Sequence, residues 1–357
     1  MEPHEPNVST SASASTNMAD DPDVETPQQQ DGRHHQTRDA RGRPLNLVPS
    51  RLDVGYKWIE YIPEFDEISQ DAEDTIYWTE KGLWKESLRE WKKKGKHGDP
   101  PQQRALSAAN PMAYHNARIL NSFPSIFNAI EQWQASHPDE PRIIGGECSW
   151  DDSLGSTNLR LHDALESKTR IKNSFLWDIA KMACRGSAKM DYILKTIKEI
   201  ASQETTIPHP DPQRAAKGET FAYQRKYVVT SSLQVCRALL WCRIVQEMGE
   251  ACVAHIMNRS ERNDTMDGWR DIYDPVSYER KDKVWIMVAG LSVICPPTTL
   301  TEGNILHGLE PPSLENMARQ AAKCQYHGGQ TQDVVKVRWL VHKQSIIETN
   351  MVNERST

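Results

Sequence analysis

The first fifty residues contain no Phe, Trp or Tyr, although the whole chain has 5 Phe, 11 Trp and 10 Tyr. They are rich in Ser, Thr, Gln, Asp and Pro, and they carry eight acidic against four basic side chains. Such a segment cannot bury enough apolar surface to offset the loss of chain entropy on folding. We therefore expect a disordered tail over 1–50, a folded domain over 51–350 and a flexible end over 351–357. A division of the domain into two lobes near 208–218 stays open.

The chain also lacks a long hydrophobic run. Its longest is VWIMVAGLSVIC, from Val284 to Cys295. This run is too short to span a bilayer and predicts a buried strand or a core helix. No apolar secretion signal opens the sequence, and the seven Cys are too scattered for a disulfide framework. We expect an intracellular protein with free thiols, in the nucleus or the cytoplasm, and without a membrane partner.

An excess of positive charge is also missing, because the formal net charge is −6 and the isoelectric point is about 6.1. This balance excludes a generally basic surface for nucleic acid but leaves room for a local patch. The candidate patch is Lys92, Lys93, Lys94 and Lys96, at the end of a helical pattern. One interpretation is a nuclear-import or nucleic-acid patch. The other is a helix end whose lysines complement the macrodipole.

Sequence signatures of catalysis are missing too. There is no GxxxxGK phosphate loop and no GxGxxG that follows a strand. The carboxylates between Glu64 and Asp74 belong to a solvated helix start, which is not a setting that raises a carboxyl pKa. We therefore expect no enzymatic activity, no catalytic residue, and no cofactor or cofactor-binding residue.

Two Cys-x-x-His pairs, Cys252 with His255 and Cys324 with His327, have the residue types of a zinc site. The pairs are far apart in the chain, and buried Cys is more often a small hydrophobic residue than a ligand. We expect no metal at these residues.

Helical periodicity dominates what is present. Residues 221–260 carry apolar side chains at intervals of three or four, which predicts one long central helix. Further helices are expected over 67–94, from the Asn110-Pro111 start, on either side of Gly186, and after Pro312. The end of the chain from Val334 alternates like a strand but also fits a helix, which we favour. The fold class that this pattern predicts is mainly α, a helical body around the central helix.

Three blocks carry a family resemblance: MAYHNARIL from Met112, LLWCRIVQEMGEACVAHIMNRS from Leu239, and VWIMVAGLSVICPPTTLTEGN from Val284. Together they resemble the fungal mating-type auxiliary family, the second protein of the one-one idiomorph of filamentous ascomycetes. The resemblance covers about 56–348. This family has neither an alpha-box nor a high-mobility-group box. Its invariant Pro and Phe residues have two sets of candidate counterparts here: Pro111, Pro124 and Phe127, or Pro296 and Pro297.

The resemblance implies a non-enzymatic regulator of mating and of sexual development after fertilisation, in fruiting bodies and ascospores. Its implied partners are other proteins, with mating-type regulators of the same locus as candidates, and direct binding of nucleic acid stays open. The alternative function is that of a nucleic-acid-associated viral nucleoprotein or coat-like protein, because a polar tail before a helical body also suits that class. The acidic charge balance weighs against this alternative.

Overall fold

The computed structural model describes residues 51–53, 59–140, 143, 165, 167–203, 205–208, 212–223, 225–256, 284–291, 303–312, 315–325 and 334–353. The tail expected over 1–50 lies outside these residues. Of the flexible end expected over 351–357, residues 351–353 belong to the last helix, and 354–357 lie outside the described residues.

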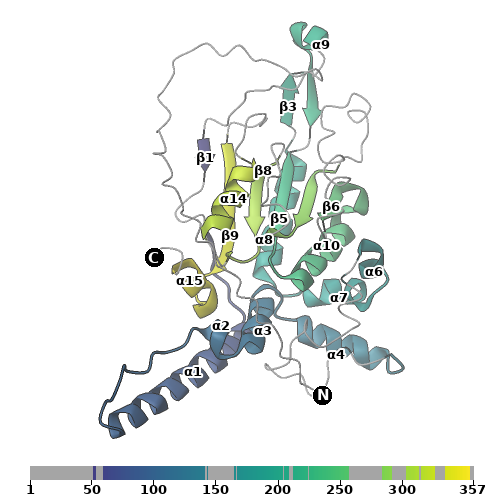
Figure 1. Ribbon diagram of the computed structural model, residues 1–357. Helices are drawn as coiled ribbons and strands as arrows, with labels where there is room; N and C mark the ends of the chain where they lie inside the picture. Colours follow the sequence, from purple (N-terminus) through teal and green to yellow (C-terminus); the bar gives the residue numbers. More distant parts are fainter. Residues whose placement is uncertain are drawn as a thin grey trace, which may run out of the picture. The chain divides into compact units, whose positions relative to one another are not determined.

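A parallel sheet lies at the centre of the fold (Figure 1). Its strands are β1 (Arg51–Asp53), β2 (Ile59–Ile62), β5 (Lys226–Thr230), β6 (Val253–Ile256), β7 (Ile286–Ala289), β8 (Gly303–Gly308) and β9 (Val334–His342). The strand order is β1-β9-β8-β5-β7-β6, and β2 pairs with a later part of β9 than β1 does. Every pairing in this sheet is parallel. Parallel strands need crossover connections, and helices supply those from β5 to β6 (Gln234–Met248) and from β8 to β9 (Glu315–Gln325).

Helices make up most of the rest. They are α1 (Glu67–Lys93), α2 (Leu106–Ala109), α3 (Pro111–Ser122), α4 (Ile126–Ser136), α6 (Lys168–Lys172), α7 (Phe175–Ala183), α8 (Ala188–Ser202), α9 (Pro212–Ala216), α10 (Gln234–Met248), the 3₁₀ turn η2 (Glu250–Cys252), α14 (Glu315–Gln325) and α15 (Ile346–Asn353). A separate antiparallel pair, β3 (Thr205–Pro208) with β4 (Thr220–Tyr223), encloses α9. These last three elements occupy the connector that we expect near 208–218.

Both faces of the sheet are covered, and alternate residues of a strand enter different cores. Tyr227 and Val229 of β5 pack with helices such as α3, α7, α8 and α10, whereas Val228 packs in a second core with α14. Ile286 and Met287 of β7 divide in the same way. The period of two along each strand therefore builds three layers, helix, sheet and helix.

The predicted fold class is wrong: the chain is α/β, not mainly α. Within 221–260, α10 covers only Gln234–Met248, and it is preceded by β5 and followed by β6. The sequence does not predict these strands because both of their faces are buried, so polar and apolar residues do not alternate along them. Gly249 ends the helix with φ of +87°, a conformation that glycine adopts without strain.

The end of the chain also differs from the expectation, because β9 is a strand where we favoured a helix. The run from Val284 contains β7, which is the buried-strand alternative. The helix expected over 67–94 is confirmed as α1, and α3 begins at Pro111 with Asn110 Oδ1 accepting from Ala113 N at 3.0 Å. Gly186 separates α7 from α8 as predicted.

Close packing between neighbouring strands gives a stability test. A Cβ atom on Gly308 of β8 would lie 1.9 Å from the ring of Trp339 of β9, which is fully buried. G308A should destabilise the fold by about 3 kcal/mol or more, because neither backbone nor ring has room to move. The melting temperature should then fall by roughly 6 to 12 °C.

Gly82 of α1 supplies the matched control, since nothing lies within 4 Å of a Cβ placed there. G82A should raise stability by roughly 0.5 to 1 kcal/mol through helix propensity. Equal effects of the two substitutions on the melting temperature would show that the Gly308–Trp339 contact is not tight.

Candidate functional site

The order of the strands locates the candidate site at the carboxyl ends of two neighbouring strands. The connection after β5 leads through α10 to β6 on one side, whereas β8 is followed by α14 and then β9 on the other. β5 and β8 are neighbours, so a topological switch point lies between their carboxyl ends. In open α/β sheets this crevice is the common place for a ligand. The residues that follow the two strands, Ser231-Ser232 and Leu309-Glu310, form the candidate site.

Glu310 occupies the crevice and binds the loop that follows β5. Its Oε1 accepts from Ser231 Oγ at 3.0 Å, Ser232 N at 2.5 Å and Ser232 Oγ at 2.7 Å. Arg118 of α3 donates from Nη2 to Ser232 Oγ at 2.8 Å, and the same nitrogen lies 3.9 Å from Glu310 Oε1. A carboxylate and a guanidinium therefore neutralise each other at the switch point.

A second guanidinium enters the crevice from α10. Arg237 is buried and donates from Nη1 to Ser231 O at 3.2 Å. Gly290, after β7, leaves the space for it, because a Cβ there would meet Arg237 Nη1 at 2.6 Å. Burial lowers the pKa of Arg237, while Glu310 opposes this by favouring the charged form. Within the described residues, Arg118 Nε, Arg237 Nε and Glu310 Oε2 have no hydrogen-bond partner.

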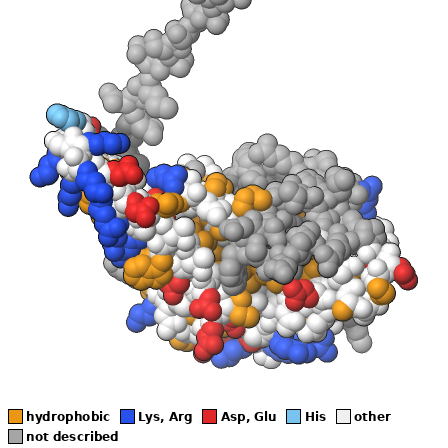
Figure 2. All heavy atoms as spheres, turned by 90° about the horizontal axis from the view of Figure 1, so that it is seen from below, with side chains coloured by type: hydrophobic (Ala, Val, Ile, Leu, Met, Phe, Trp, Pro, Cys, Tyr) orange, Lys and Arg blue, Asp and Glu red, His pale blue; other side chains and the backbone are white. Residues whose placement is uncertain are grey.

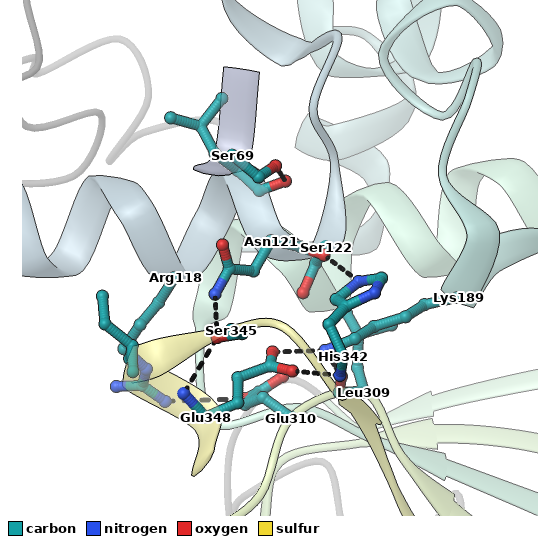
Figure 3. Close-up of polar contacts among 12 residues, drawn as sticks. Ser69, Arg118, Asn121, Ser122, Lys189, Leu309, Glu310, His342, Ser345 and Glu348 are labelled. Atoms are coloured by element: carbon teal, nitrogen blue, oxygen red, sulfur yellow. Dashed lines mark hydrogen bonds and ion pairs between the residues drawn. The ribbon is translucent and has the colours of Figure 1, made fainter. Parts of the chain in front are cut away.

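A second polar cluster lies beyond β9, around the start of α15 (Figure 3). Glu73 of α1 reaches this helix N-terminus, where its Oε2 accepts from Ile346 N at 2.5 Å and Ile347 N at 3.3 Å. Its Oε1 accepts from Asn121 Nδ2 at 2.6 Å and Ser345 Oγ at 2.5 Å. The carboxylate thus meets free amides and the positive end of the helix dipole. The expected solvated setting of the carboxylates between Glu64 and Asp74 is wrong for Glu73, because its burial raises its pKa, and these hydrogen bonds oppose the rise.

Lys189 and Glu348 form a buried ion pair in the same cluster. Lys189 also donates to Leu309 O at 2.8 Å, which joins the cluster to the end of β8. Glu348 Oε2 accepts from His342 N at 2.7 Å. Burial raises the pKa of Glu348 to about 7, and Lys189 opposes that rise.

The ring of His342 lies between two backbone carbonyls. Nδ1 is 2.6 Å from Glu64 O and Nε2 is 2.8 Å from Asn121 O. Two acceptors favour a ring with two protons, but burial and the nearby Lys189 outweigh them and lower the pKa of His342 to about 3. We take the ring as neutral, because the charged form would lack a counterion in contact with it.

These groups have the chemistry of acids and bases, but they lie out of reach of solvent. A carboxyl with a pKa near 7 suits general acid-base catalysis. Glu348, however, is only 2% exposed and Glu310 only 3%, so neither faces a substrate in this conformation. Parallel α/β folds carry many enzymes and many binding proteins, so the fold itself leaves enzymatic activity open. The expectation of no catalytic residue and no cofactor stays a prediction.

The Cys-x-x-His pairs do not come together within the described residues. His255 is a buried residue of β6 whose ring stacks on Trp241, with centroids 5.5 Å apart. Cys252 lies in η2 and Cys324 in α14, whereas His327 is outside the described residues. Nowhere in the described ranges do three His, Cys, Asp or Glu side chains gather as metal ligands would.

The buried thiols also have little nucleophilic character. Burial raises the pKa of Cys242 to about 12, and it raises the pKa values of Cys184 and Cys236 as well. The thiolate is the reactive form, so these side chains are inert at neutral pH.

One surface hollow of about 530 Å³ lies outside both clusters. Its lining residues come from α8 and α10: Asp191, Leu194, Lys195, Lys198, Glu199, Ser202 and Arg243. Most of the charges there are paired, as in the 2.7 Å contact of Lys198 with Glu247. The described helices include none that is both long and apolar enough to cross a bilayer.

The four lysines of the predicted patch lie at the end of α1 and in the turn that follows it. Lys92 and Lys93 belong to the last turn of α1, whereas Lys94 is its C-cap and lies 3.9 Å from Glu90. Lys96 follows Gly95 in a Schellman turn, with φ of 59° and its amide donating to Trp91 O at 3.0 Å. All four side chains are exposed, and the import or nucleic-acid role of the patch stays a prediction.

Sequence reasoning missed both polar clusters. Glu73 and Ser345 are 272 positions apart, and Ser231 and Glu310 are 79 apart. The available signal was placement after a strand, but it required the strands to be recognised first.

The role of Glu73 can be measured by urea denaturation. E73A removes the acceptor of two backbone amides, one hydroxyl and one side-chain amide; three of these hydrogen bonds are buried and that of Ile346 N is partly buried. It should lower the free energy of unfolding by about 3 kcal/mol or more. E86A, on the exposed part of the same helix, should change it by less than about 0.5 kcal/mol. A loss no larger than that of E86A would mean that Glu73 does not stabilise the start of α15.

Buried histidines predict a loss of stability in acid. His307 lies in β8 with Nδ1 2.8 Å from Tyr227 Oη, and burial lowers its pKa to about 3. Its pKa is depressed relative to about 6.5 in the unfolded chain, so its contribution is present above pH 6.5 and is lost as the pH falls toward 3. Glu348 works in the opposite direction, since its raised pKa favours the folded state most below about pH 4.5.

The substitution H307Q isolates one of these groups. Between pH 6 and pH 4.5, the decline in unfolding free energy should be less steep than in the wild type by about 1.4 kcal/mol per pH unit, the value of one proton. H97Q, at an exposed histidine, should leave the slope unchanged. Urea midpoints over this pH range measure both, and an unaltered slope in H307Q would contradict a neutral buried His307.

Comparison with known proteins adds little to this geometry. No family model matches the chain, and no curated protein matches it either. Among solved structures, it is similar to the crystal structure of the C-terminal part of the Fun30 ATPase domain, with 16% identity and a TM-score of 0.46. That similarity covers 87% of this chain and 90% of the other.

Proposed function

We propose that the protein is a non-enzymatic regulator that works through contacts with other macromolecules. The observation that carries the proposal is an arm, residues 81–105, made of the distal part of α1 and the segment that returns from it. No side chain of the arm is buried, whereas the near half of α1 packs against α3. In Figure 1 this part of α1 extends past the other helices. The arm therefore contributes no buried side chain to the hydrophobic core.

The arm has a defined structure despite its exposure. Trp84 Nε1 donates to Pro101 O at 2.8 Å, and Trp91 Nε1 donates to Gly98 O at 3.2 Å. At its base, Arg104 binds the carboxylate of Glu80 through N, Nε and Nη2. These contacts hold the returning segment against one side of α1. A pre-organised surface loses less entropy on binding than a flexible one.

Exposed apolar side chains add to this surface. Trp78 is 57% exposed and Leu83 is 48% exposed, and Ile68 and Tyr61 lie exposed near the root of α1. Large exposed aromatic and aliphatic residues are typical anchors of protein contacts. The proposed partners are other proteins, with mating-type regulators of the same locus as candidates, in the nucleus or the cytoplasm.

The biological part of the proposal follows from the mating-type resemblance and has a genetic test. Deleting the gene in a fungus that carries it should leave vegetative growth normal but block or impair the formation of fruiting bodies and ascospores. The full chain should restore both. Normal ascospore numbers in the deletion strain, or a vegetative defect as its main phenotype, would contradict the developmental role.

A variant gene introduced into the deletion strain tests the role of the arm. It encodes a chain in which a short Gly-Ser linker replaces residues 82–102, so that Glu80 and Arg104 are retained. This chain should fold but fail to restore ascospores. Full restoration would leave the developmental role standing and would remove the arm as its contact surface.

A further inference from the structure

One face of the arm carries a row of positive charges. Lys81, Lys85, Arg89 and Lys93 follow one another at intervals of four, and Lys92 lies beside them. On a helix this spacing aligns side chains on one face, about 6 Å apart along the axis, over about 18 Å. The stretch 81–97 has seven Lys or Arg against two Glu, although the whole chain has a net charge of −6. Figure 2 shows blue side chains gathered along the projecting part of the molecule, with a few red ones beside them.

The helix dipole does not account for this row. Its favourable effect on cations is limited to the last turn, which contains Lys92 and Lys93. Lys85 and Arg89 lie further back. Like charges at this spacing repel each other, and each pair destabilises a helix by roughly 0.2 to 0.5 kcal/mol. The arm therefore retains an arrangement that is unfavourable for its own folding.

Nor do acidic side chains neutralise the row. Within the described part of the chain, Lys85, Arg89, Lys92 and Lys93 form no ion pair. Glu86 and Glu90 are the two acidic side chains of this stretch: Glu90 approaches Lys94 at 3.9 Å, and Glu86, although one turn from Arg89, forms no ion pair with the row within the described residues. The returning segment is held on the side of Trp84 and Trp91, so it does not cover the row. The charges face solvent and are available to a partner.

An exposed indole completes this face. Trp78 lies one turn before the row, and Lys81 Nζ is 4.5 Å from the centre of its ring. One aromatic ring on a convex helix does not make the groove of stacked rings that binds single strands. A helix with one charged face can instead lie with that face along the phosphates that border the major groove of duplex DNA, which is about 12 Å wide. The deep, narrow major groove of duplex RNA would not admit it.

We propose that the basic face of the arm, Lys81, Lys85, Arg89, Lys92 and Lys93, binds the phosphates of double-stranded DNA. This rests on the proposed function only in taking the arm as the contact surface. The binding is independent of base sequence, since lysines positioned on phosphates carry no sequence information. A regulator with such an arm would meet its protein partners on DNA.

The test uses the full chain and a fluorescent 30-base-pair DNA of mixed sequence, followed by anisotropy at several salt concentrations. The triple variant K85Q/R89Q/K93Q should bind at least tenfold more weakly than the wild type. The slope of log affinity against log salt should become shallower by roughly three, one unit for each lost phosphate contact. The variant should melt no lower than the wild type, because it loses repulsion between like charges.

A matched control removes the same charge elsewhere. K181Q/K195Q/K217Q changes three exposed lysines outside the arm and should keep the affinity and the salt slope of the wild type. Equal binding by the wild type and the arm variant would overturn the proposal. So would tighter binding to the single-stranded 30-mer than to the duplex, or binding to vesicles with 30% phosphatidylserine but not to DNA. None of these outcomes depends on the ascospore phenotype, so DNA binding by the arm and the developmental role can be refuted independently.

Discussion

The carboxylate of Glu73 is the interaction on which the helical and sheet parts of the fold depend. It comes from α1, yet its four hydrogen bonds all go to residues of α3 or the start of α15. β9 ends at His342, three residues before Ser345, so the same carboxylate fixes where the chain turns after the sheet. One buried charge thus joins segments 272 positions apart. A helix N-terminus buried without a partner would be costly, and Glu73 supplies that partner.

Buried ionisable groups continue along the carboxyl edge of the sheet, and each has its partner within the fold. Lys189 pairs with Glu348, and Arg118 and Arg237 lie around Glu310. Replacing such pairs with apolar residues often keeps or improves stability, so their strength is not a sufficient reason for their presence. These pairs instead favour one packing of the helices against the sheet, because any other packing would leave a buried charge without a partner, at a high cost in free energy. The crevice that many α/β proteins use for a ligand is filled here by the protein's own Glu310.

The sequence predicts those parts of the fold whose local signals are complete. α1 has an acidic start, an apolar stripe and a Gly at its end, and α3 has Asn before Pro, so both are found nearly to the residue. The strands are different. Tyr227–Thr230 and Val253–Ile256 are buried throughout. Apolar residues spaced three or four apart in α10 continue into both strands, so the period of the apolar residues does not show where the helix ends and a strand begins.

The two polar clusters lay beyond any local pattern, because their members meet only after β5, β8 and β9 are placed side by side. In β9 the alternation of Val335, Val337, Trp339 and Val341 was a correct strand signal that a competing helical spacing outweighed. The basic face of the arm was partly visible as the lysines at 92–96. Its true extent is set by the helix, which adds Lys81, Lys85 and Arg89 and turns Lys94 away toward Glu90.

The exposure of the side chains along α1 increases abruptly after Glu80. Up to Glu80, every turn of the helix contributes a buried side chain, Ser69, Ala72, Glu73, Ile76 and Glu80. From Lys81 onward, packing into the core no longer stabilises the helix, and its most regular feature, a row of like charges, weakens it. What remains to support it is the pair of tryptophan hydrogen bonds to the returning segment. The row of Lys85, Arg89, Lys92 and Lys93 forms no ion pair within the described residues, and this is the basis for proposing a partner of opposite charge. In the proposed complex with DNA, phosphates would take the place of the missing acids and relieve the repulsion along the row.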